Sequence, residues 1–249
     1  MRDAVRIWIV SARVAPDELA GYRALLDADE RARAAALTQT ATRDRFTVAH
    51  GALRVLVGRT LDAPPERLAW SRGRYGKPTL TGPWAGPQTS LSYSGDLVAV
   101  AVGGARPVGV DIQHPTPGLD PTAMATRFFA PEEARHVAAG PDAATRADRF
   151  ARLWARKEAV VKAAGGRLWP HLAMPVHRGD VVECVDPVAV HRVSDDTTPG
   201  VYRLSDVATP AAYRVAVALA GDAPYAVESC HRLAADSDRR SGSASGRPG

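Results

Sequence analysis

The chain is poor in cysteine and aromatic residues, and it has no long hydrophobic run. Of its 249 residues, 2 are cysteine and 6% are aromatic. Cys184 and Cys230 make neither a disulfide framework nor a zinc pattern, which is compatible with a reducing cytosol. The low aromatic content counts against a base-stacking surface for nucleic acid. The apolar run at 5–10 is too short for a signal peptide or membrane span and predicts a strand, so we expect a cytoplasmic protein without membrane attachment.

Lysine is also scarce. The chain carries 32 lysines and arginines, and only Lys77, Lys157 and Lys162 are lysine. A compact ammonium on a flexible stem differs physically from a planar guanidinium, so these three positions are the first candidates for chemistry. A chance distribution is the alternative.

The net charge of +5 indicates an anionic partner, which could be nucleic acid, a phosphorylated small molecule or an acidic protein. The sequence has no run of five or more basic residues, so a nucleic-acid-binding arm is not favoured. A basic nucleic-acid-binding module remains one alternative function.

Apolar spacing and turn residues predict the following elements. Helices are expected over 17–38, 42–59, 131–139 and 146–164. Strands are expected over 97–102, 108–112, 180–186, 188–193 and 201–207. The strands at 97–102 and 108–112 are expected to form one hairpin, and 213–228 a second. The Gly/Pro-rich segment 72–88 is expected to be a loop, and the tail from Ser237 to Gly249 is expected to be disordered.

An internal similarity suggests two related halves. Residues 98–110 match residues 215–227 at seven of thirteen positions without gaps, including a glycine and a proline. We therefore predict an α+β fold of two similar α/β half-domains, 1–108 and 109–232, followed by a disordered tail at 233–249. A cleft between two such halves is a common ligand site.

Glu158 is the most unusual residue of the helix expected at 146–164. It lies on the apolar stripe, one turn after Trp154 and one turn before Lys162. A carboxylate on such a stripe is either buried and paired or functional. A simple i,i+4 Glu–Lys pair is the alternative.

Two further segments carry polar groups that suit phosphate and metal. Asp111 and Gln113 are two residues apart on a predicted strand, so their oxygens share one face and could hold Mg²⁺. Residues 72–78 place three cations in a glycine-containing loop that suits phosphate. A turn or cap role for Asp111 and a solvated surface loop are the alternatives.

Taken in order, five motifs resemble the 4′-phosphopantetheinyl transferase family, and their spacing is similar to its monomeric Sfp-type branch. The motifs are Tyr75–Pro78, Leu91–Ser94, Gly109–Gln113, Phe128–Glu133 and Trp154–Gly165. The resemblance covers about residues 5–230. It implies two halves related by a pseudo-two-fold axis, with coenzyme A and Mg²⁺ bound between them. It further implies transfer of the phosphopantetheine arm to a serine of an acyl or peptidyl carrier protein, with release of adenosine 3′,5′-bisphosphate.

The resemblance also implies roles for individual residues. Asp111, Gln113 and Glu158 match the metal-binding positions, and Glu158 matches the base that acts on the carrier serine. Lys162 matches a lysine that contacts the diphosphate. Coenzyme A contacts are implied for Arg33, Arg45, Lys77, Ser92 and Tyr93.

Two positions depart from the family pattern. Gln113 stands where the family usually has Glu, which removes one negative charge from the metal site. Tyr93 stands where a histidine is frequent, and tyrosine cannot become cationic. An inactive relative that still binds coenzyme A is therefore a further alternative. The resemblance implies an acidic carrier as partner. The apolar residues Leu119, Met124, Phe128 and Phe129 are candidates for a short hydrophobic dock, and core packing is the alternative, which we favour for the two phenylalanines.

Overall fold

The computed structural model describes residues 3–184, 200–209 and 212–232. Its helices are α1 (Pro16–Leu25), α2 (Ala28–Ala35), α3 (Thr40–Leu61), α4 (Pro121–Phe128), α5 (Pro131–Ala138) and α6 (Ala143–Ala164), with short 3-10 helices at Pro65–Arg67, Gly82–Trp84 and Trp169–His171. Its strands are β1 (Asp3–Ser11), β2 (Ala69–Arg72), β3 (Pro78–Thr81), β4 (Thr89–Ser94), β5 (Leu97–Val102), β6 (Val108–Gln113), β7 (Val181–Cys184), β8 (Gly200–Val207), β9 (Arg214–Ala220) and β10 (Tyr225–Arg232). The expected strand at 188–193 and the tail at 233–249 lie outside the described residues.

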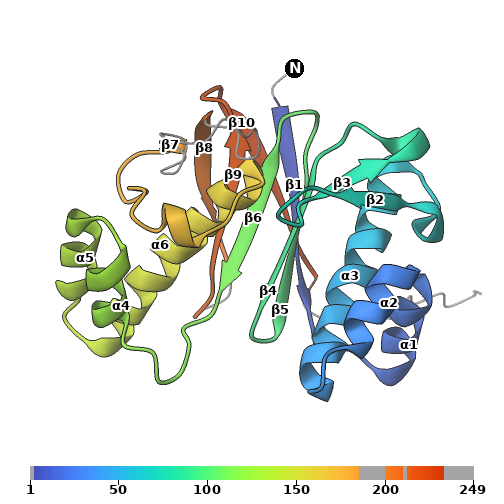
Figure 1. The fold of residues 1–249 in the computed structure, drawn as a ribbon, viewed down its shortest axis with the longest axis horizontal. Helices are drawn as coiled ribbons and strands as arrows, with labels where there is room; N and C mark the ends of the chain where they lie inside the picture. The colour runs from blue at the N-terminus through green and yellow to red at the C-terminus, as the bar shows by residue number, and fades with distance from the viewer. Residues whose placement is uncertain (1–2, 185–199, 210–211, 233–249) are drawn as a thin grey trace, which may run out of the picture.

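Two four-stranded sheets form the centre of the molecule. Their strand orders are β10-β1-β5-β4 and β6-β9-β8-β7, and β2 and β3 form a separate hairpin. Helices α1–α3 lie on one side of the paired sheets and α4–α6 on the other (Figure 1). The predicted α+β fold is confirmed.

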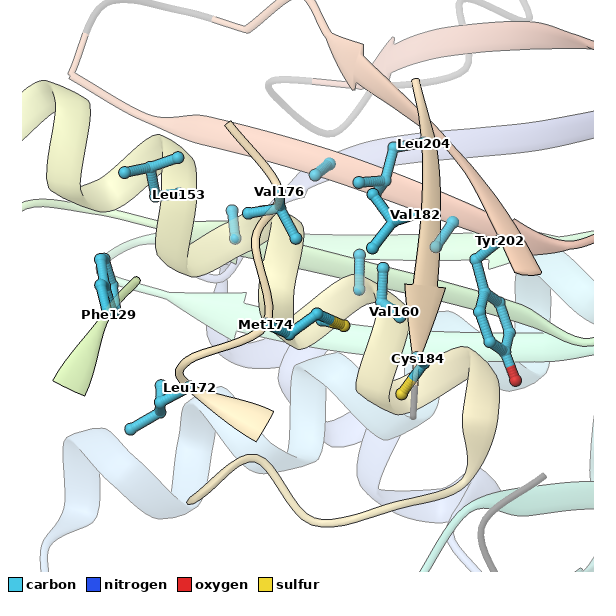
Figure 2. Close-up of a cluster of buried hydrophobic side chains, with 14 of the residues drawn as sticks. Phe129, Leu153, Val160, Leu172, Met174, Val176, Val182, Cys184, Tyr202 and Leu204 are labelled. Carbon is cyan, nitrogen blue, oxygen red and sulfur yellow. The ribbon is translucent and has the colours of Figure 1, made fainter. Parts of the chain in front are cut away.

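Three buried clusters account for this layering. Val98, Val100 and Val102 of β5 pack with α3, while Leu97, Ala99 and Ala101 on the opposite face pack against β6 and β9. Since both faces of β5 are covered, the strand is a continuous apolar run rather than an alternating one. The third cluster fills the space between α6, its sheet and the segment before β7 (Figure 2). It includes Phe129, Leu153, Val160, Met174, Val176 and Leu204.

Each sheet contains the same order of three antiparallel strands. β1 pairs with β5, which pairs with β4, and β6 pairs with β9, which pairs with β8. In both cases the first strand joins the far strand of a later hairpin, with helices between them in the chain. β10 then returns to the first sheet and pairs in parallel with β1. The predicted division into 1–108 and 109–232 therefore does not follow the sheets at the C-terminal end.

The two hairpins expected at 97–112 and 213–228 are wrong. β5 and β6 belong to different sheets, and so do β9 and β10. The turns were located correctly. The two strands that flank each turn, however, belong to different sheets, and their apolar side chains pack across the interface between the sheets. Turn chemistry alone cannot show whether the returning strand pairs with its predecessor.

Two other expectations need correction. The helix expected at 17–38 is two helices, because Leu26 is extended and Asp27 caps α2 in a capping box with Glu30. The loop expected at 72–88 contains β3, which pairs with β2. The helices expected at 42–59, 131–139 and 146–164 are confirmed, whereas α4 and β4 had no predicted counterpart. Among the described residues, no helix is long and apolar enough to span a membrane.

Candidate active site

Helix α6 lies directly on strand β6, and Gly109 allows this contact. A Cβ atom at Gly109 would stand 2.0 Å from the carbonyl oxygen of Ala159 and 2.5 Å from the amide nitrogen of Ala163. Val108, Val110 and Ile112 point into the cluster between the sheets, so Gly109 and Asp111 share the face toward α6. The close approach thereby brings Asp111 beside the last turns of α6.

Asp111 is the centre of a buried polar cluster. Its Oδ1 accepts hydrogen bonds from Ser92 Oγ at 2.6 Å and from Lys162 Nζ at 2.6 Å. Its Oδ2 accepts one from Gln113 Nε2 at 2.7 Å. Asp111 is only 2% exposed, and Lys162 also donates to Ser92 at 2.9 Å. The prediction that Asp111 and Gln113 share one face is confirmed.

A row of serines on β4 joins the two sheets at this point. Ser90 accepts from the amide of Val110, and Ser94 accepts from the amide of His114. Ser92, between them, donates to Asp111. The three serines alternate along the strand, so they share one face. Sequence analysis included Ser92 but missed Ser90 and Ser94, although the alternation of serine at 90, 92 and 94 is visible in the sequence.

Glu158 is half-buried on α6, one turn before Lys162. Burial raises the pKa of its carboxyl group, Lys162 opposes that rise, and the negative charge of Asp111 adds to it. Lys162 donates to Asp111 and Ser92, so the simple i,i+4 pair with Glu158 is not the arrangement seen. Two carboxylates that repel one another are well placed to share a cation.

Lys157 lies in a different environment from Glu158 and Lys162 of the same helix. Its side chain is fully buried, and Nζ donates to Glu133 Oε2 at 2.5 Å and to the carbonyl oxygen of Met174. The ammonium also lies 4.6 Å from the ring centroid of Phe129. Glu133 Oε1 accepts from the amide of Val176 at 2.7 Å. Sequence analysis singled out Lys157 for chemistry, but the structure gives it a packing role between α5, α6 and the chain before β7.

A cavity of about 280 Å³ lies between the two halves, and we call it the main cavity because it gathers most of the predicted site residues. Arg33, Tyr93, Lys77 and Lys162 line it, so the structure brings these four predicted residues together. Trp70, Leu53 and Leu91 contribute apolar wall, and Gly165 and Gly166 close the end near α6. An apolar pocket with several cations at its walls suits a flat, negatively charged ligand.

Lys77 reaches the cavity wall, but its ammonium is already engaged. Nζ donates to the carbonyl oxygens of Val108 at 3.3 Å, Lys162 at 2.9 Å and Ala163 at 2.5 Å. Burial lowers its pKa to about 8. A cation at these orphan carbonyls stabilises the C-terminus of α6. In this arrangement Lys77 links the two halves, whereas its sequence suggested a phosphate contact.

Arg45 lies apart from the main cavity. It lines another hollow, formed with Arg13, Asp44 and Asp96 near the start of α3. The pKa of Asp96 is lowered by its hydrogen bond to Arg13, with smaller contributions from Arg45 and His114. The structure therefore does not bring Arg45 together with the other predicted coenzyme A contacts.

A further hollow of about 240 Å³ lies beside Trp154 of α6. Trp154 and Phe150 of α6 line it together with Gln113, Leu119 and Met124. Trp154, Glu158 and Lys162 occupy successive turns of one helix face. Glu158 therefore lies between this hollow and the main cavity, which Lys162 lines. Phe129 is 6% exposed and belongs to the core, as expected.

The donor set around Asp111 fits Mg²⁺. Within the described ranges, no group of three or more His, Cys, Asp and Glu side chains gathers in a metal-binding arrangement. Asp111 and Glu158 are two carboxylates, and Gln113 adds an amide beside them. Mg²⁺ takes oxygen ligands and is often held by one or two carboxylates together with substrate phosphate and water. Two carboxylates next to a cation-lined cavity are enough for such a site.

Comparison with known proteins identifies the family. Residues 107–218 match the profile of the 4′-phosphopantetheinyl transferase superfamily. The 4′-phosphopantetheinyl transferase HetI of Nostoc sp. is 33% identical over 167 residues, which are 66% of this chain and 70% of HetI. The chain belongs to the 4′-phosphopantetheinyl transferase superfamily. The family predicted from the five motifs is thus confirmed.

Other relatives agree but are covered less completely. Protein slr0495 of Synechocystis sp., which bears the same family name, is 33% identical over 150 residues, 58% of this chain and 59% of that protein. The 4′-phosphopantetheinyl transferase AcpT of Escherichia coli is 35% identical over 117 residues, 47% of this chain and 57% of AcpT. The chain thus matches less than two thirds of the length of both relatives. The profile match contains β6 and α6, so Asp111, Glu158 and Lys162 lie within it.

Proposed function

We propose that this chain transfers the 4′-phosphopantetheine arm of coenzyme A to a serine of a carrier protein and releases adenosine 3′,5′-bisphosphate. One observation carries the proposal. On the face of α6, Glu158 stands between a cation-lined cavity and an apolar hollow, beside the ion pair of the buried Asp111 with the partly exposed Lys162. This arrangement suits a reaction between a small phosphorylated ligand on one side and a protein side chain on the other.

Coenzyme A is placed in the main cavity on the basis of charge and shape. Trp70 and Leu53 offer apolar contact for a flat base, and Arg33 and Lys162 offer cations to its phosphates. The diphosphate would lie near Lys162, because that ammonium is adjacent to the carboxylates that suit Mg²⁺. The pantetheine arm would then extend toward Glu158.

The chain's own residues supply acid–base and electrostatic groups. Glu158 accepts the proton of the carrier serine, whose hydroxyl group is a poor nucleophile until a base removes that proton. The serine oxygen bonds to the phosphorus of the pantetheine phosphate, and the bond to the leaving phosphate of the bisphosphate breaks. Lys162 stabilises the charge that develops there. Mg²⁺ held by Asp111, Glu158 and Gln113 would neutralise diphosphate charge.

The same proposal includes the relation between the halves and the place of the carrier. The matching strand orders β1-β5-β4 and β6-β9-β8 support two halves related by a pseudo-two-fold axis. The hollow lined by Leu119, Met124 and Trp154 would receive the carrier beside its serine. The chain would act as a monomer in the cytoplasm, as its resemblance to the Sfp-type branch implies.

Mass measurement of the carrier tests the function. The protein is incubated with coenzyme A, Mg²⁺ and an apo carrier protein, and the carrier is then weighed. The proposal expects the mass of one phosphopantetheine to be added, and only when Mg²⁺ is present. An unchanged carrier with measurable coenzyme A binding would favour the inactive relative. Salt-sensitive binding of DNA or RNA, without coenzyme A binding, would favour the nucleic-acid module.

Gln113→Glu is expected to lower the Mg²⁺ concentration needed for half-maximal rate. The amide of Gln113 donates to Asp111 Oδ2 at 2.7 Å, so a carboxylate there would add a hard-cation ligand close to an existing one. The measurement is initial rate against Mg²⁺ concentration, with coenzyme A saturating. Gln39→Glu, which makes the same change at an exposed position just before α3, is the control. An unchanged or higher metal requirement would place Gln113 away from the ion.

Carrier recognition is expected to weaken as salt rises. The chain has a net charge of +5, and carrier domains of this kind are acidic according to the family resemblance. Long-range attraction mainly raises the association rate, and its screening length falls from ~10 Å at 0.1 M to ~3 Å at 1 M. The measurement is kcat/KM for the apo carrier across that range. A flat profile would leave the apolar hollow as the main source of recognition.

A further inference from the structure

The turn between β2 and β3 places Lys77 of the first half against helix α6 of the second half. The turn is defined by local contacts, because the amide of Gly73 donates to the carbonyl oxygen of Lys77 at 2.9 Å and Gly76 has a φ of +85°. The aliphatic part of the Lys77 side chain then runs beside the end of α6, where a Cβ atom at Gly165 would stand 3.4 Å from Lys77 Cδ. Lys77 thus reaches α6 from a well-defined turn.

The ammonium of Lys77 joins the two elements that carry Asp111 and Lys162. Two of its acceptors, the carbonyl oxygens of Lys162 at 2.9 Å and Ala163 at 2.5 Å, belong to the last turn of α6. The third, the carbonyl oxygen of Val108 at 3.3 Å, lies at the start of β6, three residues before Asp111. One cation therefore holds the end of α6 against β6 at the point where Lys162 Nζ donates to Asp111 Oδ1 at 2.6 Å.

Lysine suits this contact better than arginine does. Three N–H bonds radiate from the single nitrogen of an ammonium group, so they can reach three carbonyl oxygens around one point, whereas the N–H groups of a guanidinium lie in one plane. Carbonyl oxygens in the last turn of a helix lack helical amide partners, and a cation beside them opposes the negative end of the helix dipole. Only 3 of the 32 basic residues are lysine, and at Lys77 the geometry gives a physical reason for one of them.

We propose that Lys77 is a positioning residue, which holds the last turn of α6 against β6 and thereby keeps the Lys162 ammonium beside Asp111. The inference rests on the proposed function only where it concerns the rate of transfer, since Lys162 then faces the charge that develops on the leaving phosphate. The position of such a group is critical, because a displacement of about 1 Å can lower a rate by about 10²-fold. Lys77 thus acts on the reaction through Lys162 and not by contact with a phosphate.

Hydrogen exchange tests the Lys77 contact without any transfer reaction. The amides to follow are those of Gly165 and Gly166, which donate to the carbonyl oxygens of Lys162 and Val161 at the end of α6. Lys77→Met keeps most of the side-chain length but removes every donor. At pH 7 these amides are therefore expected to exchange about tenfold faster in the variant than in the wild type. Wild-type exchange in Lys77→Met would overturn the proposal.

A double-mutant cycle tests whether Lys77 acts through Lys162. Lys77→Met is expected to lower kcat about tenfold and to change KM for coenzyme A by less than about threefold, the pattern of a group that matters in the transition state. In the Lys162→Met background the same substitution should change kcat by less than about twofold, because the group that Lys77 positions is then absent. A loss of about tenfold in both backgrounds, or a raised KM with an unchanged kcat, would contradict the proposal and favour a direct phosphate contact.

Two further variants complete the comparison. Arg59 is exposed on α3, so Arg59→Met removes a cation far from the end of α6 and should change neither the exchange nor kcat. Lys77→Gln keeps two N–H donors on a shorter side chain, so it should still exchange faster than the wild type at the end of α6, even if Lys77→Met does not fold. Wild-type exchange in Lys77→Gln as well would rule the contact out. Absence of transfer by the wild-type chain would contradict the proposed function, and the exchange measurement would still decide whether Lys77 holds α6.

Discussion

Glu158→Gln is expected to reduce carrier modification at least ~10²-fold, the usual scale for a general base, while the fold is retained. Glutamine has nearly the same size and shape, so the helix face between Trp154 and Lys162 stays filled. What is lost is a group that accepts the serine proton and a carboxylate that faces Asp111. The measurement is the single-turnover rate with saturating coenzyme A and Mg²⁺, together with thermal unfolding.

The control for Glu158→Gln removes another carboxylate in the same half, one that lines neither the main cavity nor the hollow beside Trp154. Glu183 is exposed on β7, so Glu183→Gln should keep the wild-type rate. A wild-type rate in Glu158→Gln would remove this residue from the mechanism. A lower unfolding temperature in that variant alone would indicate a structural role, which the half-buried position of Glu158 does not predict.

Lys157→Met is expected to lower the free energy of unfolding by about 3–5 kcal/mol. The substitution leaves the Glu133 carboxylate fully buried without its cation, and an uncompensated buried charge is costly. Burial lowers the pKa of Lys157, and the carboxylate of Glu133 raises it. The positive charge of Lys157 is therefore stabilised by Glu133. The measurement is denaturant unfolding at neutral pH.

A second substitution separates the lost ion pair from lost packing. In Lys157→Met with Glu133→Gln, no charge remains buried, and the amide oxygen can still accept from the amide of Val176. This double variant should therefore recover part of the lost stability. Arg59→Gln, exposed on α3, should change stability by less than about 0.5 kcal/mol. A small effect of Lys157→Met would mean that the pair is not what holds α5 to α6.

Much of the fold and of the candidate site could be predicted because the relevant signals are local. The apolar spacing and the glycine stop of α6 are contained within one segment, and Gly165 adopts the left-handed conformation that ends the helix. The alternation of Asp111 and Gln113 follows from strand geometry alone. Conversely, the break between α1 and α2 depends on a capping box at Asp27 and Glu30, which a search for apolar periodicity passes over.

By itself the sequence determined the helices α3, α5 and α6, the strands β5 and β6, the family, and the placement of Asp111, Glu158 and Lys162 in two motifs. Only the tertiary structure decided that β10 pairs with β1, that Lys77 binds the end of α6, and that Lys157 joins Glu133. It also separated Arg45 from the main cavity. The physical reason is range. Propensity and periodicity act within a few residues, whereas a buried cation binds whichever oxygen atoms packing brings to it, here 17 to 86 residues away.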